Sequence, residues 1–177
     1  METRELLNKY RTILVDILKC EEKDIKFYHL DEDPGYFNLD GFLKNPNTKE
    51  IGSVIEDVDK PEEDWLVINW NLGTYKVVFL GEELASFRLY RMPHCCAIIV
   101  SCNASVSEKY RNMGIGKQLN FLRQDIGKML GYSLMMCTDI AQNTCQRKIL
   151  AANGWRDVCS VLNKRTKNKV FVSVINL

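Results

Sequence analysis

The chain has 177 residues, of which 46% are hydrophobic, and its formal net charge at pH 7 is +1. This length and composition can supply the core of one domain and require no division into several. A net charge so close to zero creates no global field that would recruit nucleic acid or an anionic membrane, so nucleic-acid binding has no positive support.

The first third of the sequence predicts one helix and one strand. The helix ends near Cys20, and residues 24–30 form a short strand followed by a turn at Asp31–Gly35. The next thirty residues have no clear assignment. Their acidic run, Glu56–Asp64, is interpreted as a solvated loop, with a substrate-facing acidic rim as the alternative. The helix is predicted from apolar residues at helical spacing: Leu6, Leu7, Tyr10, Ile13, Leu14, Ile17 and Leu18.

The middle of the chain has β character. Residues Trp65–Ile68 and Thr74–Leu80 are strand-like, and Gly81-Glu82 is typical of a tight turn into a further strand over Leu84–Arg91. This pattern predicts an antiparallel meander.

A strand, a glycine-containing turn and a helix follow in order over residues 96–129. The segment Cys96–Val106 is uncharged and rich in small and β-branched residues, as a largely buried strand would be. A segment with two glycines, Val106–Lys117, comes next. The apolar residues after it recur at three- and four-residue steps and predict a helix: Ile115, Leu119, Leu122, Ile126 and Met129.

The glycine segment has the chemistry of an anion site. The first N–H groups of a helix have no intrahelical partner and coincide with the positive end of the helix dipole. Gly114 and Gly116 allow unusual dihedrals and a close approach of phosphate to the backbone, while Arg111 and Lys117 add positive charge. On spacing alone, two glycines that simply end a turn before a surface helix remain an equal alternative.

Two better-known phosphate loops are excluded. A P-loop requires four residues between its glycines and a Lys-Ser/Thr pair, but here a single residue separates Gly114 from Gly116. A dinucleotide fingerprint requires a third glycine, and the residue three after Gly116 is Leu119.

The C-terminal part predicts a strand, a capped helix and a hairpin. The strand covers Tyr132–Asp139, Asn143 is a suitable helix N-cap, and Asn153-Gly154 is a helix stop signal. Strands over Asp157–Leu162 and Val170–Ile175 then form a closing hairpin. Its basic turn is interpreted as solvated, with proximity to phosphates as the alternative.

The cysteines, histidines and N-terminus indicate a cytoplasmic protein without a metal. An odd number of cysteines, seven, at scattered positions is a poor disulfide framework, and the two histidines give no metal-ligand spacing. We expect most thiols to be buried in a reducing compartment. The charged start lacks the apolar run of a signal peptide, and no stretch is suited to span a bilayer.

Two motifs resemble the GNAT family of N-acetyltransferases. The family signature, Arg or Gln, two residues, Gly, one residue, then Gly or Ala, matches Arg111-Asn112-Met113-Gly114-Ile115-Gly116, with Val106 and Tyr110 at the usual flanking positions. A later family motif has an Asn followed eleven residues on by Gly and an aromatic residue, as Asn143 is followed here by Gly154-Trp155. The resemblance covers residues 74–177 well and the first seventy poorly.

The resemblance implies an α/β fold with a twisted mixed sheet, flanked by helices, whose fourth and fifth strands splay apart. It implies one N-acetyltransferase domain over residues 1–177, with residues 1–63 divergent. The implied co-substrate is acetyl-CoA, with its pantetheine arm beside backbone groups near Val106. The amides of Asn112, Met113, Gly114, Ile115, Gly116 and Lys117, together with Arg111, would hold the pyrophosphate, and Asn143 would contact the cofactor from the second helix.

The catalytic residues are not assigned, because the sequence departs from the family pattern. Many members have a Tyr acid seven residues after the conserved Asn, where this chain has Leu150, and residues 101–105 offer no carboxylate as a base. Asp139 could act through water, but a cap or turn role is the simpler interpretation. Cys145 is interpreted as a partly buried thiol and His94 as a turn residue.

The resemblance therefore implies direct transfer of an acetyl group to a primary amine of a small molecule or a protein. The alternative is a non-catalytic acyl-CoA-binding sensor or interaction module, which the missing Tyr favours. The sequence identifies neither the acceptor nor the oligomeric state, so a homodimer stays open.

Overall fold

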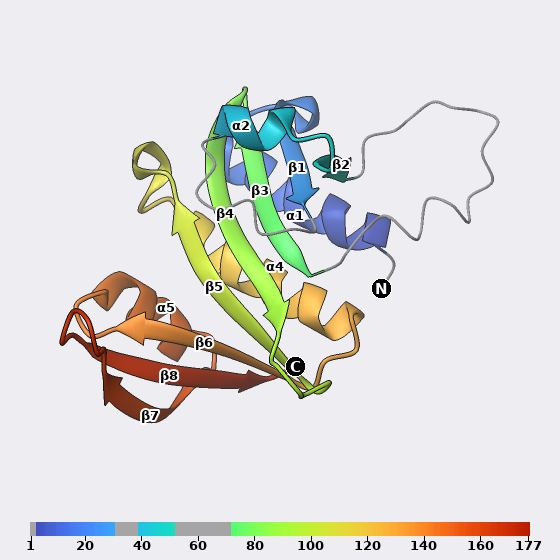
Figure 1. Ribbon diagram of the computed structural model, residues 1–177. Helices are drawn as coiled ribbons and strands as arrows, with labels where there is room; N and C mark the ends of the chain where they lie inside the picture. Colours follow the sequence, from blue (N-terminus) through green and yellow to red (C-terminus); the bar gives the residue numbers. More distant parts are fainter. Residues whose placement is uncertain (1–2, 31–38, 52–71) are drawn as a thin grey trace. The chain divides into compact units, whose positions relative to one another are not determined.

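The computed structural model describes residues 3–30, 39–51 and 72–177. Its strands form one eight-stranded mixed sheet in the order β2-β1-β3-β4-β5-β6-β8-β7, and helices flank it (Figure 1). In chain order the elements are α1 (Thr3–Leu18), η1 (Glu22–Asp24), β1 (Ile25–Leu30), α2 (Leu39–Lys44), β2 (Lys49–Ile51), β3 (Gly73–Phe79), β4 (Glu82–Arg91), β5 (Ile98–Val106), η2 (Glu108–Tyr110), α4 (Ile115–Met129), β6 (Leu134–Ile140), α5 (Thr144–Ala152), β7 (Arg156–Leu162) and β8 (Lys169–Asn176).

The chain divides into two compact units, each discontinuous in sequence. The first consists of Met1–Arg88 and Asn103–Ile115, and the second of Leu89–Cys102 and Gly116–Leu177. Strands β4 and β5 contribute residues to both units.

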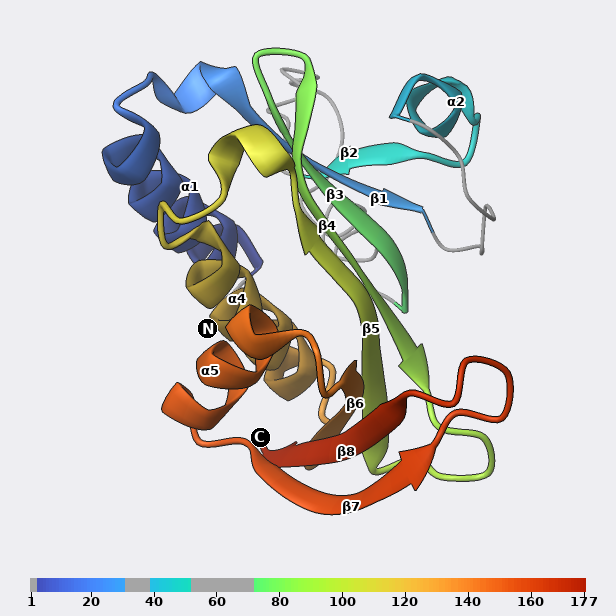
Figure 2. The same ribbon diagram turned by 90° about the vertical axis from the view of Figure 1, so that its left-hand side faces the viewer.

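In the first unit, β1 pairs antiparallel with both β2 and β3. Figure 2 shows α1 and α2 on opposite sides of these strands. The guanidinium of Arg11 in α1 lies 5.9 Å from the ring centroid of Phe27, and Lys76 Nζ lies 5.2 Å from that of Phe42 in α2. Because Phe27 pairs with Val77 and strand side chains alternate, Phe27 and Lys76 mark opposite faces of the sheet.

Aromatic rings fill the core on the α1 side of the first unit. Tyr75 and Phe87 stack with centroids 4.8 Å apart, and His29 lies 4.6 Å from Tyr75. The hairpin between β3 and β4 turns through Leu80 (φ 49°) and Gly81 (φ 81°), one residue earlier than predicted. Two positive φ values in a two-residue loop match the right-handed twist of the flanking strands.

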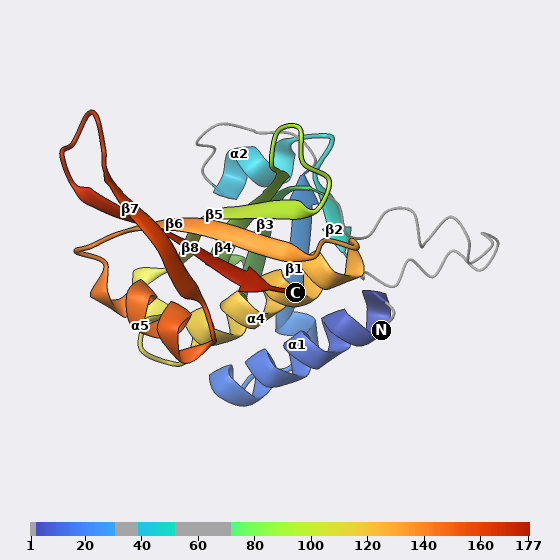
Figure 3. The same cartoon turned by 90° about the horizontal axis from the view of Figure 1, so that it is seen from below.

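In the second unit, β6 lies between a parallel and an antiparallel neighbour. The parallel ladder with β5 runs only from the pair Ile98–Leu134 to the pair Val100–Met136, although β5 extends to Val106 and β6 to Ile140. Strand β6 stays paired with β8 along its whole length. The predicted closing hairpin is confirmed as β7 and β8, and α4 and α5 lie on the same side of β6 and β8 (Figure 3).

The helices α4 and α5 follow the sequence patterns that predicted them. Helix α4 spans the predicted apolar stripe, of which Ile115, Leu119, Leu122 and Ile126 are buried. Helix α5 begins after the predicted N-cap Asn143, whose Oδ1 accepts the Gln146 N–H at 3.3 Å. It ends at Ala152 with Asn153 as its C-cap, and the following Gly154 (φ 83°) lets the chain reverse into buried Trp155.

Some expectations are wrong and others lie outside the described residues. Of the seven cysteines, all free, only Cys137 is buried, while Cys96, Cys145 and Cys159 are exposed; the expected burial of most thiols is therefore wrong. The short elements α2 and β2 were not predicted. The predicted turn at Asp31–Gly35, the acidic run Glu56–Asp64 and the strand Trp65–Ile68 fall outside the described ranges.

The described ranges contain no helix that is both long and apolar enough to cross a membrane. Within the same ranges, no group of three His, Cys, Asp or Glu side chains is arranged to hold a metal ion.

Candidate functional site

The glycine segment forms a loop with two left-handed residues directly before α4. Asn112 has φ 65° and Gly114 has φ 85°, and α4 begins at Ile115. A Cβ atom built on Gly114 would meet nothing within 4 Å, so the space on that side of the Gly114 backbone is open. Because the first N–H groups of α4 lack intrahelical partners, this loop can bind an anion through its backbone.

Gly116 does not have the turn role that the sequence suggested. It is the second residue of α4 and has no positive φ. The backbone freedom needed by the loop is instead used at Asn112 and Gly114, because Asn is among the few residues that tolerate the left-handed region. Lys117, also in the first turn of α4, is exposed.

The chain before the loop is anchored to β4 and to the end of β5. Tyr110 is buried, donates its hydroxyl to Glu82 Oε2 at 3.2 Å and packs edge-on against Phe79. Arg111 Nε donates to the carbonyl of Val106 at 3.2 Å. The predicted residues Val106 and Arg111 therefore contact each other, and the Val106 carbonyl already has a partner.

Asn143 and Asp139 interact at the start of α5. Asp139 is the penultimate residue of β6 and is 6% exposed, and its Oδ2 has no hydrogen-bond partner among the described residues. Burial raises the pKa of Asp139, while Arg147 and a hydrogen bond with Asn143 oppose this shift. Asp139 is thus a buried carboxyl with an increased affinity for a proton, which a simple cap or turn role does not require.

A second polar group holds α5 on the closing hairpin. Arg147 Nη2 lies 2.7 Å from Asp157 Oδ2, and Ser173 Oγ donates to Asp157 Oδ1 at 2.7 Å. The hydrogen bond from Arg147 is the main reason why the pKa of Asp157 is lowered. The Arg147 guanidinium also lies 3.6 Å from the ring centroid of Phe171.

The other proposed catalytic positions have structural explanations. Leu150, at the family's Tyr position, is buried and has no proton to donate. His94 is an exposed residue in the turn between β4 and β5 with φ 58°, as the sequence predicted. Cys145 lies on α5 and is exposed, so its interpretation as a partly buried thiol is wrong.

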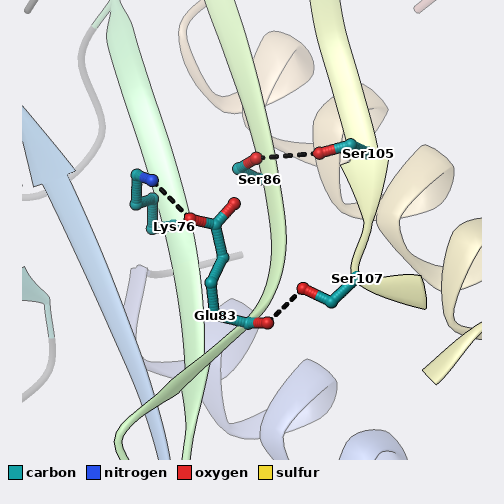
Figure 4. A network of polar contacts seen from close by, with 5 residues as sticks. All are labelled: Lys76, Glu83, Ser86, Ser105 and Ser107. Carbon is teal, nitrogen blue, oxygen red and sulfur yellow. Dashed lines mark hydrogen bonds and ion pairs between the residues drawn. The ribbon is translucent and has the colours of Figure 1, made fainter. Parts of the chain in front are cut away.

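Sequence reasoning missed a polar network formed by side chains of β3, β4 and β5 and by Ser107 just after β5 (Figure 4). Buried Lys76 forms an ion pair with Glu83, whose backbone carbonyl accepts the Ser107 hydroxyl. The Ser86 and Ser105 hydroxyls lie 3.0 Å apart beside them. The signal was a single lysine in the middle of an otherwise uncharged strand.

A buried arginine on α4 was missed as well. Arg123 is 2% exposed and donates to the Ser101 hydroxyl on β5 and to Asn120 Oδ1, each at 2.9 Å. The signal was present, because Arg123 follows Leu119 by four residues and precedes Ile126 by three, which places it within the apolar stripe.

Comparisons with known proteins identify the fold. No family model matches the sequence, and no curated protein matches it significantly. Among solved structures, a GNAT-family acetyltransferase from Streptococcus pneumoniae matches with a TM-score of 0.54 and 13% identity, over 60% of this chain and 67% of that chain. A Salmonella typhimurium protein assigned as an acetyltransferase, solved with its cofactor acetyl-CoA, matches with a TM-score of 0.52 and 11% identity, over 60% of this chain and 65% of that chain.

A eukaryotic structure gives the same result. Arabidopsis thaliana Naa50, in complex with the bisubstrate analogue CoA-Ac-MVNAL, matches with a TM-score of 0.51 and 15% identity, over 59% of this chain and 72% of that chain. The chain thus spans about two thirds of the length of the first structures that it matches. At such identities the similarity establishes the fold, and the chain has the fold of the GNAT acetyltransferases. The predicted fold class is confirmed.

Proposed function

We propose that this chain is an N-acetyltransferase that takes an acetyl group from acetyl-CoA and transfers it to a primary amine, with residues 1–177 acting as one catalytic domain. The observation that carries the proposal is the loop before α4. Its left-handed residues, Asn112 and Gly114, directly precede the free N–H groups of a helix, at the family's signature position on the family's fold. Related folds have been solved with acetyl-CoA and with a CoA-peptide analogue, which supports this choice of cofactor.

The backbone N–H groups from Asn112 to Lys117 would hold the pyrophosphate, with the Lys117 ammonium adding positive charge. Groups of β5 near Val106 would pair with the pantetheine arm. The Val106 carbonyl already accepts the Arg111 side chain, so neighbouring groups of β5 would make this pairing. Asn143 would contact the cofactor from the start of α5.

Bound acetyl-CoA would supply a thioester whose carbonyl carbon is open to nucleophilic attack. The acceptor must reach it as a neutral amine, because an ammonium has no free electron pair. Asp139 is suited to take up the amine's proton, through water, since burial raises its pKa and its Oδ2 has no partner among the described residues. Buried Leu150 provides no acid for the leaving thiolate.

The proposal is tested by incubating the protein with acetyl-CoA and a panel of acceptors: small aliphatic amines, lysine-containing peptides and peptides with free N-termini. We expect thiol release that requires both an acceptor and the intact loop, so that Gly114→Glu abolishes it. Binding of acetyl-CoA without release for any acceptor would support the alternative, a non-catalytic acyl-CoA-binding module. Failure to bind acetyl-CoA would contradict both functions.

A further inference from the structure

Arg123 is a buried cation held entirely by neutral groups. Its Nε donates to the Leu119 carbonyl at 3.3 Å, its Nη1 to Ser101 Oγ and its Nη2 to Asn120 Oδ1. All these partners belong to the second unit. Among the described residues, no carboxylate forms an ion pair with Arg123.

The guanidinium stays charged in spite of its burial. Desolvation lowers the pKa of Arg123 to about 10, which keeps it protonated near neutral pH. The nearby Cys137 thiol cannot serve as a counter-ion, because burial raises its pKa to about 12. A buried charge that no opposite charge compensates destabilises a fold by several kcal/mol in general, and such costs are concentrated at functional sites. Because no described carboxylate compensates this charge, an anionic ligand near Arg123 would be stabilised by it.

The charge lies where the parallel strands β5 and β6 stop pairing. Their last register pair is Val100–Met136, and the next residues along the two strands are Ser101 and Cys137. Arg123 donates a hydrogen bond to Ser101 and interacts electrostatically with the Cys137 thiol. Because the Ser101 oxygen accepts from Arg123, the hydroxyl hydrogen of Ser101 remains able to donate to another group.

We propose that Ser101, polarised by Arg123, stabilises the thiolate of coenzyme A as it leaves, in place of the acid that Leu150 does not provide. This inference rests on the proposed function. The acceptor nitrogen forms a bond to the thioester carbon, the carbon–sulfur bond then breaks, and its electron pair stays on sulfur as the thiolate. The extra proton on nitrogen passes to water or to a base. Ser101 is then the catalytic residue, and Arg123 is a positioning residue that orients the hydroxyl and adds positive potential.

The test compares the affinities of coenzyme A and desulfo-coenzyme A for the whole chain by calorimetry across the pH range around the free thiol pKa. Stabilisation of the thiolate lowers the pKa of the bound thiol below that of the free coenzyme A thiol. The ratio of the two affinities therefore rises with pH between these two pKa values and is constant outside that range. The total rise is about tenfold for each unit by which the pKa is lowered. The desulfo ligand corrects for protein groups nearby that titrate: Cys102, Cys137, Asp139 and Asp157.

Variants separate this role from a structural one. We expect Arg123→Met and Ser101→Ala to remove the rise of the ratio with pH, and Arg147→Met, which removes another arginine of the same unit, to retain it. A purely structural role would change both affinities equally and leave the ratio curve as in the wild type, which would overturn the inference. A flat ratio in the wild type with both ligands bound would also overturn it, whereas binding of neither ligand would refute the proposed function itself.

Discussion

Substitution of Gly114 separates the backbone geometry of the loop from its capacity to bind phosphate. Gly114 has φ 85°, and a Cβ there would point into open space, so alanine introduces backbone strain without a steric clash. The left-handed conformation costs a non-glycine residue about 1–2 kcal/mol. For a chain of this size the melting temperature should fall by about 2–8 °C, taking about 2–4 °C for each kcal/mol.

The Gly114→Glu variant has the same strained backbone and places a carboxylate beside the N–H groups at the start of α4. Its melting temperature without ligand should be equal to or above that of Gly114→Ala, because an acidic group near a helix N-terminus contributes about 0.3–1 kcal/mol. Its binding of acetyl-CoA should be lost, since its carboxylate competes with the phosphates. Gly116→Ala is the matched control, because Gly116 is helical and the substitution should leave binding intact.

The assay is the shift in melting temperature on addition of acetyl-CoA. A ligand at a hundred times its dissociation constant stabilises the native state by about 2.7 kcal/mol. We expect the wild type, Gly114→Ala and Gly116→Ala to shift and Gly114→Glu to show no shift. An undiminished shift in Gly114→Glu would show that the phosphates are bound elsewhere.

Three further predictions concern buried groups. Since the pKa of Asp139 is raised in the folded state, its ionisation opposes folding once the pH exceeds the unfolded pKa of 3.8. The Asp139→Asn variant should therefore have a higher melting temperature than the wild type at pH 7, and this difference should disappear as the pH falls toward 3.8. The variant should also have a lower kcat, and a kcat equal to that of the wild type would exclude a role of Asp139 as base. Lys76→Met leaves part-buried Glu83 without its ion pair and should lower the free energy of unfolding, measured by urea titration, by about 1–3 kcal/mol. Lys109→Met removes an exposed ion pair with Glu82 and should have little effect. Equal effects of the two substitutions would show that burial does not strengthen the Lys76–Glu83 pair. Leu150→Tyr places a larger side chain at a buried position and should lower the free energy of unfolding by about 1–3 kcal/mol in the same urea titration. An unchanged free energy of unfolding would mean that there is free space around residue 150.

The sequence predicted long elements and missed short ones. Helix α4 and the β7–β8 hairpin were predictable, because an apolar stripe over fifteen residues or two strands around a polar turn give a strong periodic signal. Helix α2 has six residues and β2 three, too few for any periodicity to be recognised. Their positions depend on tertiary contacts such as the burial of Phe42.

For the candidate site, the sequence predicted the loop and the cap but not the buried charges. Glycine at 114 and asparagine at 143 act through local backbone geometry, which a motif encodes directly. Lys76 pairs with Glu83 on the neighbouring strand of the hairpin, and Arg123 depends on a partner more distant in sequence, Ser101 on β5. Whether a cysteine is buried also depends on contacts distant in sequence, which is why most cysteines are more exposed than the sequence analysis predicted.

The most direct test of cofactor binding is a calorimetric titration of the wild-type chain with acetyl-CoA, with Gly114→Glu and Gly116→Ala beside it. We predict that each chain binds one acetyl-CoA, which coenzyme A displaces, and that binding is kept in Gly116→Ala and lost in Gly114→Glu. No heat of binding in the wild type at millimolar acetyl-CoA would show that the loop before α4 does not hold this cofactor.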